Sequence, residues 1–102
     1  MPTALPTAAF EDVRTRAEAR LARNMRIKSM ITERLGLDVD PAVVSDNQPL
    51  FGRGLEMDSL DTLEIVVMVN NEYAVLISDD DFEAFGSINA LVDFIEAREA
   101  AA

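Results

Sequence analysis

The stretch "DSLDTLEIVVMVNNEY", residues 58–73, decides the fold because it can be interpreted in two ways. Its run of Ile and Val could form a β-strand, since both residue types favour sheets. From Leu60 onward, however, the apolar residues recur every three or four positions, which is the period of a helix. No other segment of the chain offers a convincing partner strand. The sequence therefore predicts a helix over residues 59–73, capped by Asp58 or Ser59.

On the N-terminal side, apolar residues at helical spacing run from Phe10 to Leu35, and Gly36 then supplies a stop. The pattern fits one long helix or two helices with a break near Asn24. The first half of this segment is rich in Arg and Ala and has few large apolar side chains. We therefore expect that half to extend beyond the body of the domain.

On the C-terminal side, Ser78 and Asp81 have the spacing of a capping box and predict a short helix that ends at Phe85. Ser87 is placed to cap a last helix, whose apolar residues again follow the helical period. Residues 37–58 form a long connection between the first two main helices. Apolar residues within it can pin it to the helices, with a short turn of helix at "PAVVS".

Together these elements predict an all-α fold, a four-helix bundle of three main helices and one short helix. A long loop joins the first and second helices, and the first helix is extended at its N-terminus. The expected organisation has three parts. Residues 1–24 are an N-terminal extension, a flexible leader followed by an Arg-rich helix; residues 25–98 are the domain; residues 99–102 are a frayed tail.

The composition excludes several classes of function. The chain contains no Cys and no His, which removes disulfides, thiolate or imidazole metal sites and His-based catalysis. Lys28 is the single lysine, so no catalytic set can be assembled, and neither enzymatic activity nor a metal site is expected. No apolar run is long enough to span a membrane, and the N-terminus lacks the pattern of a signal peptide. A cytoplasmic location is therefore expected.

The net charge of −10 is unevenly distributed along the chain. Residues 1–35 hold seven basic and four acidic side chains, a balance of +3, whereas residues 36–102 hold two basic and 15 acidic side chains, a balance of −13. An acidic body of this density repels nucleic acid and attracts basic protein surfaces. We expect protein partners with basic surfaces and no nucleic-acid partner, and we expect the chain itself to be a monomer.

Ser59 stands at the start of the predicted helix, with Asp58, Asp61 and Glu64 beside it. A serine nucleophile would need a base and an oxyanion hole, and the sequence indicates neither. Helix capping explains the local pattern, and acids in a first turn also favour the positive end of the helix dipole. Taken alone, these residues fit an acidic helical interaction module in which Ser59 is only a cap.

The longer stretch "LFGRGLEMDSLDTLEIVVMVNNEY" resembles the centre of acyl carrier proteins and the related peptidyl carrier domains. The mark of this family is a D-S-L triplet at the start of its second helix, after a loop that ends in a Gly-Leu approach. The matching residues here are Gly54, Leu55, Asp58, Ser59 and Leu60. Further along, "SDDDF" and "SINALVDFI" resemble the third and fourth helices, so the resemblance covers residues 25–98.

The resemblance implies that Ser59 carries a covalent 4′-phosphopantetheine arm, which a phosphopantetheinyl transferase takes from coenzyme A. The thiol of the arm would hold acyl or aminoacyl groups as thioesters for enzymes of a fatty-acid, polyketide or other specialised pathway. Met30 and Met68 are expected first to pack in the core, and they would also make it adaptable enough to admit an acyl chain. Acyl-loading and acyl-processing enzymes with basic docking surfaces would bind the carrier at the start of the helix. The residues expected on that surface are Asp58, Leu60, Asp61, Glu64 and Val67.

The sequence also departs from typical fatty-acid carriers. Asn70 and Asn71 stand where carboxylates are usual, and Val67 makes the exposed side of this helix more apolar. A specialised acyl, polyketide or peptide pathway is therefore at least as well supported as fatty-acid synthesis. The Arg-rich extension exceeds the usual length, and its charge contrast with the body suggests either docking to a partner or packing against the acidic helices.

Overall fold

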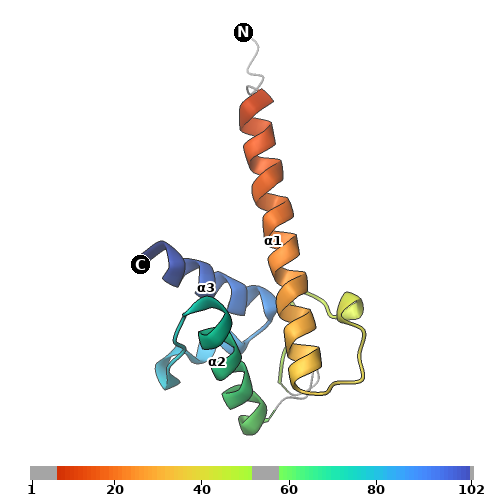
Figure 1. The fold of residues 1–102 in the computed structure, drawn as a ribbon, viewed down its shortest axis with the longest axis vertical. Helices are drawn as coiled ribbons and strands as arrows, with labels where there is room; N and C mark the ends of the chain where they lie inside the picture. Colours follow the sequence, from red (N-terminus) through yellow and green to blue (C-terminus); the bar gives the residue numbers. More distant parts are fainter. Residues whose placement is uncertain (1–6, 52–57, 102) are drawn as a thin grey trace.

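A computed structural model describes residues 7–51 and 58–101 of the chain. Within these ranges the secondary structure is entirely helical (Figure 1). The elements in chain order are α1 (Thr7–Arg34), the 3₁₀ turn η1 (Pro41–Val43), α2 (Ser59–Tyr73), the 3₁₀ helix η2 (Asp79–Phe85) and α3 (Ile88–Ala101). The predicted all-α fold, with three main helices, a short one before the last and a long loop after the first, is confirmed.

Helix α1 is one continuous helix of 28 residues, without a break at Asn24. The Asn24 side chain is buried and donates a hydrogen bond to the Asn89 side chain (2.9 Å), so it does not compete for the backbone of its own helix. The helix ends at Arg34, and Gly36 beyond it has a positive φ of 64°, as expected of the predicted stop. Figure 1 shows the first half of α1 projecting from the body, which makes the molecule 57 Å long.

The hydrophobic core lies between the second half of α1 and the other two long helices. Ile27 and Ile31 of α1 are fully buried against apolar side chains of α2 and α3. The long loop contributes Val44 and Leu50, which confirms that its apolar residues pin it to the helices. The members contributed by α2 and α3 are Ile65, Met68, Val69, Ile88, Leu91, Val92 and Ile95.

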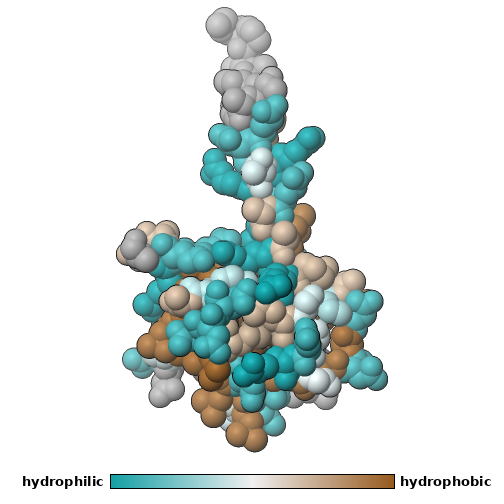
Figure 2. Space-filling model, in the orientation of Figure 1, coloured by the Kyte–Doolittle hydropathy of each residue, from teal (hydrophilic) through white to brown (hydrophobic). Residues whose placement is uncertain are grey.

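At the start of α2, the apolar period alone does not indicate which residues are buried. Leu60 and Leu63 fit the helical period, yet they are 71% and 62% exposed. The buried positions are Ile65, Met68 and Val69. The physical reason is that α2 begins beyond the ends of its neighbouring helices (Figure 1). Figure 2 shows apolar surface gathered at this end of the body.

The short helix η2 begins with the predicted capping box. One carboxylate oxygen of Asp81 accepts hydrogen bonds from the backbone N–H and the hydroxyl of Ser78, both at 2.9 Å. The backbone hydrogen bond is the main reason that the pKa of Asp81 lies below its usual range. The backbone leaves helical geometry at Asp81, so the segment is a kinked 3₁₀ helix.

At its C-terminal end α3 reaches the last of the described residues, and a frayed tail over residues 99–102 stays a prediction. The helix continues to Ala101, and Arg23 of α1 forms an ion pair with Glu99 in its last turns (2.6 Å). Alanine-rich sequence also has high intrinsic helix propensity. The hydrogen bond to Glu99 is the main cause of a raised pKa of Arg23, whose guanidinium also lies 5.2 Å from the Tyr73 ring centre.

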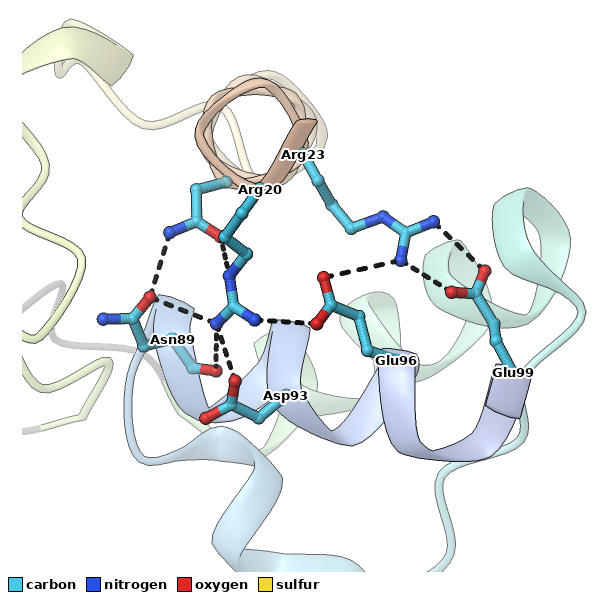
Figure 3. Close-up of polar contacts among 7 residues, drawn as sticks. Arg20, Arg23, Asn89, Asp93, Glu96 and Glu99 are labelled. Atoms are coloured by element: carbon cyan, nitrogen blue, oxygen red, sulfur yellow. Dashed lines mark hydrogen bonds and ion pairs between the residues drawn. The ribbon is translucent and has the colours of Figure 1, made fainter. Parts of the chain in front are cut away.

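Ion pairs join the Arg-rich half of α1 to the acidic face of α3 (Figure 3). Arg20 lies 2.7 Å from Asp93 and 2.9 Å from Glu96, and it also donates a hydrogen bond to the backbone carbonyl of Asn89. Of the two alternatives for the arginines, packing against the acidic helices is therefore the one observed at Arg20 and Arg23.

A second polar cluster fastens the long loop to the helices. The Lys28 ammonium of α1 is nearly buried and lies 2.7 Å from the Asp46 carboxylate. From α3, Asn89 donates its backbone N–H to the carbonyl of Asp46 (2.9 Å) and its amide to the Asn47 side chain (2.8 Å). Hydrogen bonding to Lys28 is the main reason that the pKa of Asp46 is lowered.

We predict that Asp46→Asn lowers the free energy of unfolding at pH 7 by about 1–2 kcal/mol, because Lys28 then lacks its charged partner in a nearly buried site. A lowered folded-state pKa means that the ionised Asp46 stabilises the fold at neutral pH. This contribution is lost as the pH falls below the unfolded value of about 3.9 and through the folded value. Urea unfolding at pH 7 and in acid measures both effects.

The matched control is Glu72→Gln, which breaks the exposed ion pair between Arg26 and Glu72. Its effect at neutral pH should be much smaller, since exposed ion pairs contribute little. Equal effects of the two substitutions, or a difference between Asp46→Asn and the parent that persists in acid, would contradict the assigned role of the Lys28–Asp46 pair.

Candidate functional site

The first turn of α2 is held by a reciprocal capping box. Asp58 is the N-cap residue, and its carboxylate accepts a hydrogen bond from the backbone N–H of Asp61 (3.0 Å). In return the Asp61 carboxylate accepts one from the backbone N–H of Asp58 (3.0 Å). Of the two capping residues considered from the sequence, the structure thus selects Asp58.

Ser59 is the first residue inside the helix, and it is exposed. Within residues 7–51 and 58–101, no group makes a hydrogen bond to its hydroxyl. The backbone N–H groups of a first helical turn carry partial positive charge, so a negative group attached here is favoured. Asp58 therefore occupies the capping position, and Ser59 is not the N-cap of α2.

Around Ser59, the expected partner surface contains exposed apolar side chains and an acidic side chain that pairs with α1. Leu60 and Val67 are 71% and 46% exposed and lie seven residues apart, on one face of α2. Glu64 lies between them and pairs with Arg34 of α1 at 2.7 Å. The sequence analysis missed Leu63, which is also exposed on this helix; its three-residue spacing from Leu60 would have indicated it.

An apolar hollow of about 300 Å³ lies beside η2. Phe51, at the end of the described part of the loop, and Phe85 of η2 meet edge to face with ring centres 6.4 Å apart. Phe82 is 75% exposed and also lines the hollow. The sequence analysis did not single out these phenylalanines, although an exposed aromatic residue among acids was a usable signal.

Met30 and Met68, expected in an adaptable core, lie together between α1 and α2. They line an open hollow of about 400 Å³ with Glu33 and Arg34. The mixed lining makes this hollow less apolar than the one beside Phe51. Two residues of the recognised motif, Gly54 and Leu55, lie outside the described residues.

Two further observations concern residues 7–51 and 58–101. None of their helices combines the length and the apolar character that a bilayer crossing requires. They also contain no group of three or more carboxylates placed to hold a metal ion.

The family described as "Phosphopantetheine attachment site" matches residues 25–95, more than half of the chain. The chain belongs to this family. Phosphopantetheine-attachment domains carry a covalent 4′-phosphopantetheine, so this chain is a carrier domain with that cofactor. Such carriers interact in general with a phosphopantetheinyl transferase and with biosynthetic enzymes, and they are generally not catalysts themselves.

The start of α2 fits the chemistry of this cofactor. Attachment requires an accessible hydroxyl, and Ser59 offers one at the positive end of a 15-residue helix. The helix start is fixed independently by Asp58 and Asp61, so modification of Ser59 would not remove the cap. The exposure of Ser59 at an independently capped helix start therefore agrees with the family match.

We predict that Asp58→Ala lowers the free energy of unfolding by about 0.5–2 kcal/mol, because it removes the N-cap. Ser59→Ala should change it by less than about 0.5 kcal/mol, because the hydroxyl has no structural bond among the described residues. Urea titrations followed by circular dichroism compare the two variants. A Ser59→Ala protein as destabilised as the Asp58→Ala protein would show that the serine, not the aspartate, caps α2.

Proposed function

We propose that Ser59 is the attachment residue for 4′-phosphopantetheine and that the chain carries acyl or aminoacyl groups between enzymes. The observation that carries this proposal is the exposed Ser59 hydroxyl, which Asp58 leaves unused by capping the helix in its place. When bound, the arm supplies a terminal thiol that holds the cargo as a thioester, in a chain with no cysteine of its own.

In the attachment step, the Ser59 Oγ forms a bond to the phosphorus that bears the pantetheine in coenzyme A. The bond from that phosphorus to the adenosine bisphosphate breaks, and the hydroxyl proton passes to a base of the transferase. This chain contributes the hydroxyl, the positive helix end that favours a phosphodiester, and a capped helix that holds the hydroxyl in place. The base is external, which accounts for a site without histidine.

The partner surface is proposed to be the exposed side of α2 that follows Ser59. Leu60, Leu63 and Val67 supply apolar contacts, and Glu64 adds a carboxylate that Arg34 only partly neutralises. Asp58 and Asp61 add negative charge while they hold the cap. Such a surface suits enzymes with apolar sockets ringed by basic side chains, and long-range attraction would speed encounter.

The cargo and pathway are proposed from the rest of the surface. Asn70 and Asn71 are exposed and uncharged near the end of α2, unlike the carboxylates typical of fatty-acid carriers. This favours a specialised acyl, polyketide or peptide pathway, with the chain acting as a carrier and not as an enzyme. The apolar hollow beside Phe51 and Phe82 offers a place where an acyl group could shelter from water.

A cytoplasmic location and a domain spanning residues 25–98 stay predictions.

The first test is the intact mass of the protein after incubation with coenzyme A and a broad-specificity phosphopantetheinyl transferase. We expect a gain of one phosphopantetheine in the parent and none in Ser59→Ala. Ser45→Ala is the matched control, because Ser45 is another exposed serine, in the loop before α2. A gain in the folded Ser59→Ala protein, or loss of the gain in Ser45→Ala, would show that another residue is modified.

A second test concerns the partner surface. Leu60→Ala and Val67→Ala should each slow transfer of the arm by about tenfold, the equivalent of about 1.4 kcal/mol, because each removes an exposed apolar contact. The control is Leu76→Ala, which truncates a residue 67% exposed outside α2. Initial rates at increasing salt should also fall in the parent. Equal rates for all three variants would place the transferase contact elsewhere.

A further inference from the structure

Two ion pairs join α1 to α2, one towards each end of the contact between these helices. Arg26 of α1 lies 2.8 Å from Glu72 of α2. Arg34, the last residue of α1, lies 2.7 Å from Glu64. The two arginines are eight residues apart and so are the two glutamates, in the opposite order, because the helices run antiparallel (Figure 1). The two pairs are therefore alike in chemistry, and the Arg34–Glu64 pair is the one nearer to Ser59.

Glu64 stands in the middle of the proposed partner surface. It follows Leu60 by four residues and precedes Val67 by three, so it shares their face of α2. At about 1.5 Å per residue, it lies about 7.5 Å along the helix axis from Ser59. An enzyme that binds this face to reach the Ser59 hydroxyl therefore comes close to the Glu64 carboxylate.

The Glu64 carboxylate already has a cationic partner from the chain itself. Arg34 donates a hydrogen bond from its Nε to one carboxylate oxygen, and no other group among residues 7–51 and 58–101 donates to this carboxylate. A basic side chain of a partner enzyme would meet a carboxylate whose charge is partly compensated, with a like charge beside it. Both effects weaken the attraction between the carrier and a basic surface.

The Arg34–Glu64 pair can open without disturbing the fold. The two side chains are 46% and 49% exposed, and exposed ion pairs contribute little to stability. Arg34 also lines the open hollow of about 400 Å³ beside Met30 and Met68. Its side chain therefore has room to leave Glu64 while the core stays packed.

We propose that Arg34 weakens recognition of the carrier by basic partner enzymes, because it competes with their lysine and arginine side chains for Glu64. The inference rests on the proposed function, from which it takes the partner surface, and it adds a residue of α1 that sets the affinity of that surface. Weaker binding shortens the time that an enzyme stays bound. A short residence suits a chain that passes its cargo from one enzyme to the next.

The test is equilibrium binding of a broad-specificity phosphopantetheinyl transferase to the full chain, measured by calorimetry at low salt. The Ser59→Ala background is used and coenzyme A is left out, so that docking is measured apart from attachment. Arg34→Gln should lower the dissociation constant about three- to tenfold, because it frees the Glu64 carboxylate. In about 0.5 M salt the gain should shrink to less than about twofold, because exposed charges are then screened.

Arg26→Gln is the matched control, because it makes the same change in net charge and breaks the equivalent pair with Glu72. Glu72 lies about 12 Å farther along α2 than Glu64, so this variant should change the dissociation constant less than about twofold. In a chain that also carries Glu64→Gln, Arg34→Gln should have no larger effect than Arg26→Gln. The carboxylate for which Arg34 competes is then gone.

Equal effects of Arg34→Gln and Arg26→Gln, a gain that persists in the Glu64→Gln chain, or no binding of the transferase by any variant would overturn the proposal. Failure of the proposed attachment site gives a different result. In that case the transferase binds the carrier but adds no phosphopantetheine to the parent in the mass measurement, and the effect of Arg34→Gln on binding is still observed.

Discussion

Burial of Ile27 and Ile31 on the second half of α1 is the interaction on which the rest of the structure depends. Both side chains are fully buried, and full burial of an isoleucine contributes about 1.5–3 kcal/mol. Helix α1 packs against α2, α3 and the loop turn η1, so its buried residues lie where these elements meet, whereas η2 packs on α3. In a domain this small, few other side chains could replace them.

Polar contacts then fix the relative orientation of the loop and the helices, which apolar burial alone does not determine. Hydrophobic contacts favour compaction without direction, whereas hydrogen bonds and ion pairs select one geometry. Lys28 and Asn89 hold Asp46 and so fix the loop that leads toward α2. Arg20 fixes α3 against α1. The position of Ser59 follows from the packing of its own helix, because Met68 and Val69 of α2 are buried in the core.

Much of this fold follows from local sequence pattern, and the exceptions have physical causes. The limits of α2, Ser59–Tyr73, agree with the apolar period and the acids before it. The choice between Asp58 and Ser59 as cap could not be made, because both residue types cap well and only backbone geometry separates them. The exposure of Leu63 was not expected for another reason: periodicity reports which residues share a face, not where neighbouring helices end.

The joint between α1 and α3 has a consequence for how the molecule responds to its surroundings. It is built from guanidinium groups and carboxylates, and the chain has no histidine. Histidine is the side chain that ordinarily changes its charge between about pH 5 and 8, and the joint contains none. Proton concentration in the physiological range therefore exerts no control over this joint. Dissolved ions do, because they screen partly exposed charges. The strength of the interaction between α1 and α3 thus depends on ionic strength and not on pH.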